Sequence, residues 1–103
     1  MTTLVLPLKG EYFDQISDGT KPEEYRLVNA YWSKRLIGRS YSRIELTKGY
    51  PARDDHGRRL SRAWRGYVIK TITHPHFGAA PVHVFAIDVT GAAASIGEQE
   101  PTP

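Results

Sequence analysis

Chemically versatile side chains gather in one short segment, where Lys21, Glu24 and Arg26 follow a glycine. A lysine and a carboxylate that share a water-poor cleft can exchange a proton near neutral pH, and such a lysine can act as a base or a nucleophile. The same groups also suit binding without reaction, because the carboxylate accepts hydrogen bonds from a base amino group while the two cations hold phosphate. A solvated surface ion pair, worth less than about 1 kcal/mol, is the simpler alternative. Thr20 is a further candidate catalytic group beside Lys21.

A turn followed by a strand is expected to position this cluster. The Asp-Gly pair at residues 18–19 predicts the end of a helix, because glycine adopts the left-handed conformation that closes a helix at little steric cost. Pro22 favours extended geometry at Lys21, the residue before it. The residues that follow should form a strand, whose alternating side chains put Glu24 and Arg26 on one face. Lys21 would then lie at the mouth of this strand, in a loop able to direct it into a cleft.

Four positions of the segment match a known family pattern. Gly19, Lys21, Glu24 and Arg26 fit G-x-K-x-x-E-x-R, and the sequence thereby resembles phage and bacterial members of the ASCH domain family, which are small β-barrels similar to the RNA-binding PUA fold. The resemblance implies an α+β chain, a small mixed PUA-like β-barrel with two short helices near its mouth. It also implies a cleft, lined by the motif, that binds RNA or a modified nucleotide or nucleobase. The other segments that look similar are residues 6–16, 31–36, 48–51 and 84–87, so the likeness covers most of residues 3–90.

The same resemblance leaves an enzymatic alternative open. One branch of the family contains amidohydrolases that remove the acetyl group of N4-acetylcytidine with a lysine, a threonine and a glutamate. Lys21 matches their lysine, whereas Glu24 stands where they have the threonine, and Glu45 is the candidate for their second acid. Another branch resembles ribonucleases. In a hydrolase of either kind, Lys21 would be the base or nucleophile and Glu24 the proton carrier.

Positive charge is concentrated in residues 48–70, which carry seven basic residues and two aspartates. Arginine binds phosphate bidentately and aromatic rings stack on bases, so this segment suits a phosphate-bearing partner, although a solvated loop has the same composition. Tyr31 and Arg35 lie four apart on a predicted helix and could face the same cleft as Lys21. A third alternative is a protein-interaction module that uses the aromatic surface near Tyr31 and Trp64. With the motif, the expected nucleic-acid contacts are Tyr31, Arg35, Arg53, Arg58, Arg59, Arg62, Trp64 and Arg65.

The chain is expected to form one domain at residues 1–90, with an arginine-rich loop at 51–63 and a flexible tail at 91–103. Asn29 is the expected N-cap of the second of two helices. Hydrophobic periodicity predicts these helices at residues 11–17 and 30–37, and strands at residues 3–8, 41–47, 64–73 and 82–89 and from residue 23 onward.

Composition narrows the classes of site that the chain can carry. The 103 residues have a formal net charge of +3 and include no cysteine, which excludes disulfides, thiolate metal sites and a cysteine nucleophile. His74 and His76 do not complete a zinc site by themselves, so we expect neither a metal nor a cofactor. The sequence shows no secretory signal and no apolar run near the ~20 residues that cross a bilayer. We therefore expect a cytoplasmic protein without membrane contact, whose oligomeric state the sequence leaves open.

Overall fold

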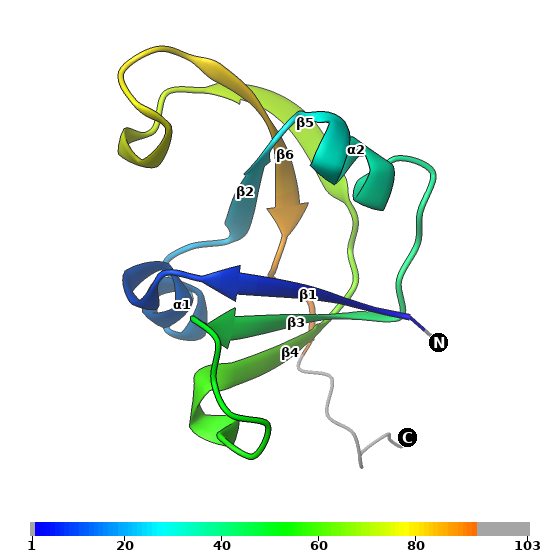
Figure 1. Cartoon of the computed structure of the whole chain (residues 1–103), viewed down its shortest axis with the longest axis vertical. Helices are drawn as coiled ribbons and strands as arrows, with labels where there is room; N and C mark the ends of the chain where they lie inside the picture. The colour runs from blue at the N-terminus through cyan, green and yellow to red at the C-terminus, as the bar shows by residue number, and fades with distance from the viewer. Residues whose placement is uncertain (1, 93–103) are drawn as a thin grey trace.

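The computed structural model describes residues 2–92, which form a small α+β fold (Figure 1). No helix in this range is long and apolar enough to cross a membrane. The expected tail falls outside the described residues from position 93 onward. In chain order the elements are β1 (Thr3–Leu8), α1 (Gly10–Ser17), β2 (Glu23–Leu27), α2 (Ala30–Leu36), β3 (Arg43–Lys48), the 3-10 helix η1 (His56–Arg58), β4 (Arg59–Ala63), β5 (Tyr67–Ile72), the 3-10 helix η2 (Pro75–Phe77) and β6 (Val82–Asp88).

The first sheet is mixed and has the strand order β1-β3-β4. Strand β1 runs parallel to β3, and β4 runs antiparallel to β3. Along β1 the side chains of Leu4, Leu6 and Leu8 are buried while Val5 is half exposed, because only one face of the strand meets the core. This alternation is what the sequence predicts for a sheet with one solvated face.

The second sheet is antiparallel and has the order β2-β6-β5. Its central strand contributes Val84, Phe85, Ala86 and Ile87, all almost completely buried. Since successive side chains of a strand point to opposite faces, burial of four in a row means that β6 is covered on both sides.

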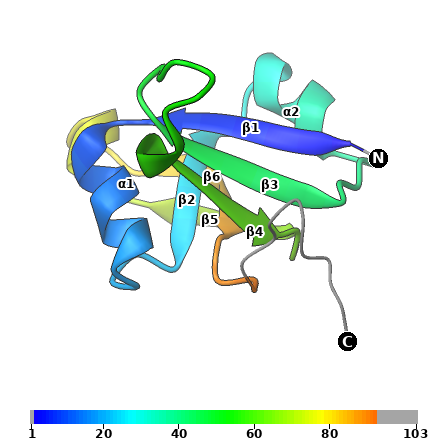
Figure 2. The same cartoon turned by 90° about the horizontal axis from the view of Figure 1, so that it is seen from below.

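The strands of the two sheets run in crossing directions, and the core fills the space between them (Figure 1). Seen from below, β1, β3 and β4 lie in front of the second sheet, with α1 and α2 on opposite sides of the molecule (Figure 2). Phe13 and Ile16 of α1 and Leu36 of α2 complete the core. Within residues 2–92 the two sheets remain separate three-stranded sheets rather than a closed barrel.

One predicted element is wrong. The segment predicted as a loop at residues 51–63 contains η1 and then β4, whose Leu60 pairs with Leu46 of β3. Strand β4 is an edge strand of the first sheet and carries arginines, so its sequence lacks the apolar alternation of a half-buried strand. Pairing with β3 decided its conformation, as expected where sheet context outweighs local preference.

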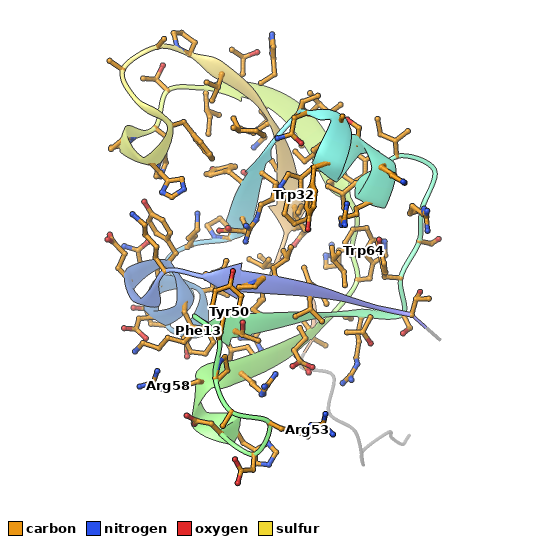
Figure 3. The ribbon with its side chains drawn as sticks, viewed as in Figure 1. Phe13, Trp32, Tyr50, Arg53, Arg58 and Trp64 are labelled. Carbon is orange, nitrogen blue, oxygen red and sulfur yellow. The ribbon has the colours of Figure 1, made fainter. Side chains whose placement is uncertain are left out.

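A turn before β2 and a helix cap after it lie where the sequence predicts them. Gly19 has a positive φ of 86° after the end of α1, which returns the chain toward β2. Asn29 caps α2 by accepting a hydrogen bond from the backbone N–H of Trp32 at 2.9 Å. The cap fixes where α2 begins and therefore the direction in which the Trp32 side chain projects. Figure 3 shows this side chain extending from α2 toward β1.

Candidate functional site

A pocket of about 290 Å³ opens where parts of both sheets and both helices converge. Its wall combines cations, one carboxylate and aromatic rings. Strand β2 supplies the floor, the end of β1 and the start of α1 form one side, and the turn that contains η2 forms another. The lining residues are Pro7, Leu8, Lys9, Tyr12, Lys21, Glu24, Tyr25, Arg26, Leu27, Asn29, Trp32, His74, His76 and Phe77.

Glu24 is the buried acid of this pocket, with only 8% of its side chain exposed. One carboxylate oxygen lies 3.6 Å from Nζ of Lys21, and the other lies 3.0 Å from Nη2 of Arg26. The three residues that the sequence singles out are therefore brought together, with the carboxylate between two cations. Both cations are also largely shielded from solvent, with 11% of the Lys21 side chain and 18% of the Arg26 side chain exposed.

Burial raises the pKa of the Glu24 carboxyl above its ordinary value of 4.5, because the loss of water outweighs the attraction of Arg26 and Lys21. The upward direction of this pKa shift is informative, since two adjacent cations alone would lower the pKa. A carboxyl with a raised pKa can accept and release protons closer to neutrality than a surface carboxyl can. The group is thus suited either to proton transfer or to accepting hydrogen bonds from a ligand that replaces the lost water.

Lys21 is held against two aromatic rings rather than in solvent. Its Nζ lies 4.5 Å from the centroid of the Tyr25 ring and 5.2 Å from that of Tyr12. Such cation–π contacts stabilise an ammonium group by about 0.5–2 kcal/mol and leave its N–H bonds available. Lys21 can therefore donate hydrogen bonds to a ligand in the pocket.

Arg26 connects the two sheets at the back of the pocket. Its Nη2 donates to the carbonyl oxygen of Pro7 at 2.9 Å, and its guanidinium lies 5.1 Å from the ring centroid of Trp32. The Nε atom is buried without a hydrogen-bond partner among the described residues. A buried donor without a partner carries a desolvation cost, which offsets part of the stability that the other contacts of Arg26 supply.

The turn between β5 and β6 covers another side of the pocket with His74, His76 and Phe77. His74 accepts a hydrogen bond from the backbone N–H of His76 at Nδ1, so its neutral ring carries the proton on Nε2. Partial burial lowers the pKa of His76, and the positive charge of Lys9 adds to this. Both histidine rings pack edge-on against Tyr12, with ring centroids 5.8 Å apart in each case. A wall of aromatic rings results.

Sequence reasoning missed this aromatic wall. The His-Pro-His-Phe turn is visible at residues 74–77, but its distance from the motif along the chain conceals that the two meet. Only the pairing of β2 with β6 and of β6 with β5 brings the turn beside β2. Trp32 packs against the core and also lines the pocket. Tyr12, in the first turn of α1, lines the pocket too.

Thr20, the third predicted catalytic residue, is occupied elsewhere. Its hydroxyl lies 2.7 Å from a carboxylate oxygen of Asp18 and 3.3 Å from the carbonyl oxygen of Gln15. Thr20 is exposed and stabilises the turn that follows α1. Its position therefore favours a structural role over participation in the pocket.

Tyr31 and Arg35 line a second hollow that adjoins the pocket. The guanidinium of Arg35 lies 3.5 Å from the centroid of the Tyr31 ring. Arg26 and Trp32 contribute to both hollows. The structure therefore places Tyr31 and Arg35 beside the cluster around Lys21, rather than inside the pocket.

No residue of the arginine-rich segment at 51–63 lines the pocket, although Arg62 shares a neighbouring hollow with Lys21. Figure 3 shows Arg53 and Arg58 at the opposite end of the molecule from α2. Arg59 is bound to Glu45 at 2.6 Å, so the glutamate that was the candidate second acid is engaged in an ion pair, and it does not line the pocket. The remaining predicted residues have other partners: Arg58 pairs with Asp55, Arg65 with Asp88, Arg62 donates to the carbonyl of Ser61, and Trp64 packs edge-on against Tyr41. Their contact with nucleic acid stays a prediction.

No group of three or more histidines and carboxylates that could hold a metal is found among residues 2–92. Comparisons with models of known protein families, with characterised proteins and with solved structures gave no match. The chemistry of the site therefore has to be argued from its own geometry.

Proposed function

We propose that the pocket binds a nucleobase, as part of RNA or of a modified nucleotide, and that the chain is an ASCH-type domain whose two sheets correspond to a PUA-like barrel. The observation that carries the proposal is the buried Glu24 carboxylate, held between two cations and surrounded by aromatic rings. The mixed sheet and the position of the G-x-K-x-x-E-x-R motif at the start of β2 support the family assignment.

Each part of the pocket matches one part of a nucleotide. A carboxylate accepts hydrogen bonds from a base amino group, as Glu24 would here. Flat rings such as Tyr12 and Trp32 can stack on or against a base, and stacking of this kind supplies about 1–3 kcal/mol per base. Lys21 and Arg26 offer N–H donors for a carbonyl or phosphate oxygen.

Fluorescence anisotropy with fluorescein-labelled RNA hexamers of uridine, adenosine, cytidine and guanosine tests the proposal at low salt, where phosphate contacts are strongest. Replacing Lys21 by alanine should weaken binding of the preferred hexamer about 10- to 100-fold, because a hydrogen bond from a charged group in a shielded site is lost. Lys70→Ala is the matched control, since Lys70 is exposed on β5 and its replacement removes the same positive charge. Absence of binding to every hexamer, or equal losses in both variants, would reject the proposal.

A hydrolase is the second candidate, favoured by the raised pKa of Glu24 and by Lys21 at 3.6 Å from it. In this case Glu24 carries the proton and Lys21 acts as base or nucleophile toward an acylated base or an RNA phosphodiester. Incubation with N4-acetylcytidine and with labelled RNA, without added metal, measures the release of cytidine or of cleaved RNA. Turnover no greater than that of the Lys21→Ala, Glu24→Ala double variant removes the catalytic alternative.

A further inference from the structure

The second hollow, which we call the side groove, lies next to the pocket and has about 530 Å³ of space. It shares Pro7, Arg26 and Trp32 with the pocket, so the two are joined along these side chains. The other residues that line it are Thr3, Leu4, Val5, Tyr31, Arg35, Tyr41 and Tyr50.

The chemistry of the side groove suits a phosphate with a base attached to it. Its lining includes two arginines and four aromatic residues, and no carboxylate. Arg35 lies over the ring of Tyr31 and donates from Nη1 to the carbonyl oxygen of the same residue at 3.1 Å, which holds the guanidinium in place. Tyr50 is 91% exposed, so its ring is accessible for a base to stack on it.

The volume of the pocket indicates that a bound nucleic acid would extend beyond it. At about 290 Å³ the pocket lies at the lower limit for small-ligand sites, and one base with its sugar would fill it. Another hollow, of about 370 Å³, adjoins the pocket at Lys21 and includes Arg62, but it also contains Asp18 and has no aromatic residue on which a base could stack. A second nucleotide is therefore better accommodated in the side groove, which combines Arg26 and Arg35 with aromatic rings and has no carboxylate.

We propose that the side groove binds the nucleotide adjacent to the one whose base occupies the pocket, so that the ligand is single-stranded nucleic acid rather than a free base or nucleoside. This inference rests on the proposed function of the pocket. The phosphate that links the two nucleotides lies at Arg26 and Arg35, and the second base stacks on Tyr50 or Tyr31.

Isothermal titration calorimetry with a mononucleotide and a dinucleotide tests the inference. The probes are the 5′-monophosphate of the base preferred in the hexamer series and the 5′-phosphorylated dinucleotide of the same base. The unsubstituted protein should bind the dinucleotide about 5- to 150-fold more tightly, the range that corresponds to stacking of one further base.

Substitutions in the side groove should remove this advantage while leaving the mononucleotide affinity intact. Tyr50→Ala and Arg35→Gln are expected to reduce dinucleotide binding, and Tyr50→Phe should retain it because the ring is kept. Arg53→Gln is the charge-matched control, since Arg53 is exposed at the far end of the molecule.

The outcomes separate this inference from the proposed function. If both ligands bind equally and Glu24→Gln weakens both, the pocket function stands and the side groove inference is overturned. Equal losses in Arg35→Gln and Arg53→Gln would also overturn it, because only general charge would then be acting. If neither ligand nor any hexamer binds, both proposals fail.

Discussion

Replacing Glu24 by glutamine should make the folded protein more stable at pH 8 and leave its stability nearly unchanged at pH 4. The carboxylate lies 3.0 Å from Arg26 and 3.6 Å from Lys21, which is worth about 5 kcal/mol of attraction for each pair at an effective dielectric constant near 20. The pKa of Glu24 is nevertheless raised, so the cost of removing water from the carboxylate exceeds this attraction. Glutamine has nearly the same shape and no charge to desolvate, and this gain is partly offset because Lys21 and Arg26 lose their counter-ion.

The direction of the pH dependence follows from the raised pKa. Below pH 4.5 the carboxyl is protonated in both the folded and the unfolded chain, and Glu24 resembles glutamine. Between 4.5 and the higher pKa of the folded state, the folded chain binds more protons than the unfolded chain. The free energy of unfolding therefore falls as pH rises through this window. The loss amounts to about 1.4 kcal/mol for each pKa unit of separation and is complete above the folded pKa.

Urea unfolding followed by tryptophan fluorescence at pH 4, 5, 6, 7 and 8 measures this difference for the unsubstituted protein and the Glu24→Gln variant. Glu11→Gln, an exposed position on α1, controls for the change in net charge. The expected result is a gap in favour of Glu24→Gln that widens with pH and then levels off. A Glu24→Gln variant that is less stable than the unsubstituted protein at pH 8, by an amount that grows with pH, would refute the reasoning. The carboxylate would then be stabilised overall by its two cations.

Two further predictions concern the scaffold. Arg59→Met should lower the free energy of unfolding by about 1–3 kcal/mol, because Arg59 pairs with a partly buried Glu45 at 2.6 Å and also donates to the carbonyl oxygens at residues 51–52. Arg58→Met is the control: Arg58 belongs to an exposed ion pair, so the same urea titration should show a loss of less than about 1 kcal/mol. Gly91→Ala should lower the melting temperature by several degrees, since its Cβ would overlap the backbone carbonyl of Ala63. An unchanged melting temperature would show that this contact relaxes freely.

Local periodicity was enough to predict most of the elements. The helices predicted at residues 11–17 and 30–37 are observed as Gly10–Ser17 and Ala30–Leu36, and the closing strand predicted at 82–89 as Val82–Asp88. In each case the apolar spacing or a cap, such as Asn29, lies within the element itself. Strand β4 escaped prediction because the partner that stabilises it, β3, is separated from it by a turn and a 3-10 helix.

The candidate site likewise has one part that the sequence predicts and one part that it does not. Lys21, Glu24 and Arg26 are neighbours along the chain, so a turn and a strand suffice to predict that they cluster. The burial of Glu24, and with it the raised pKa, depends on α1, on the end of β1 and on the turn that carries His74. No residue within the motif encodes that enclosure.

By itself, the sequence determined the identity and local order of the reactive groups, because side-chain alternation and turn geometry act over a few residues. Only the tertiary structure decided which groups lose their water and which remain solvated. Desolvation depends on atoms from distant segments that fill the space around a charge, so the fold buries Glu24 and leaves Arg53 exposed. The local cluster became part of a pocket because β1, both helices and the turn between β5 and β6 line the same hollow as β2, whereas β4, at an edge of the first sheet, contributes no residue to it.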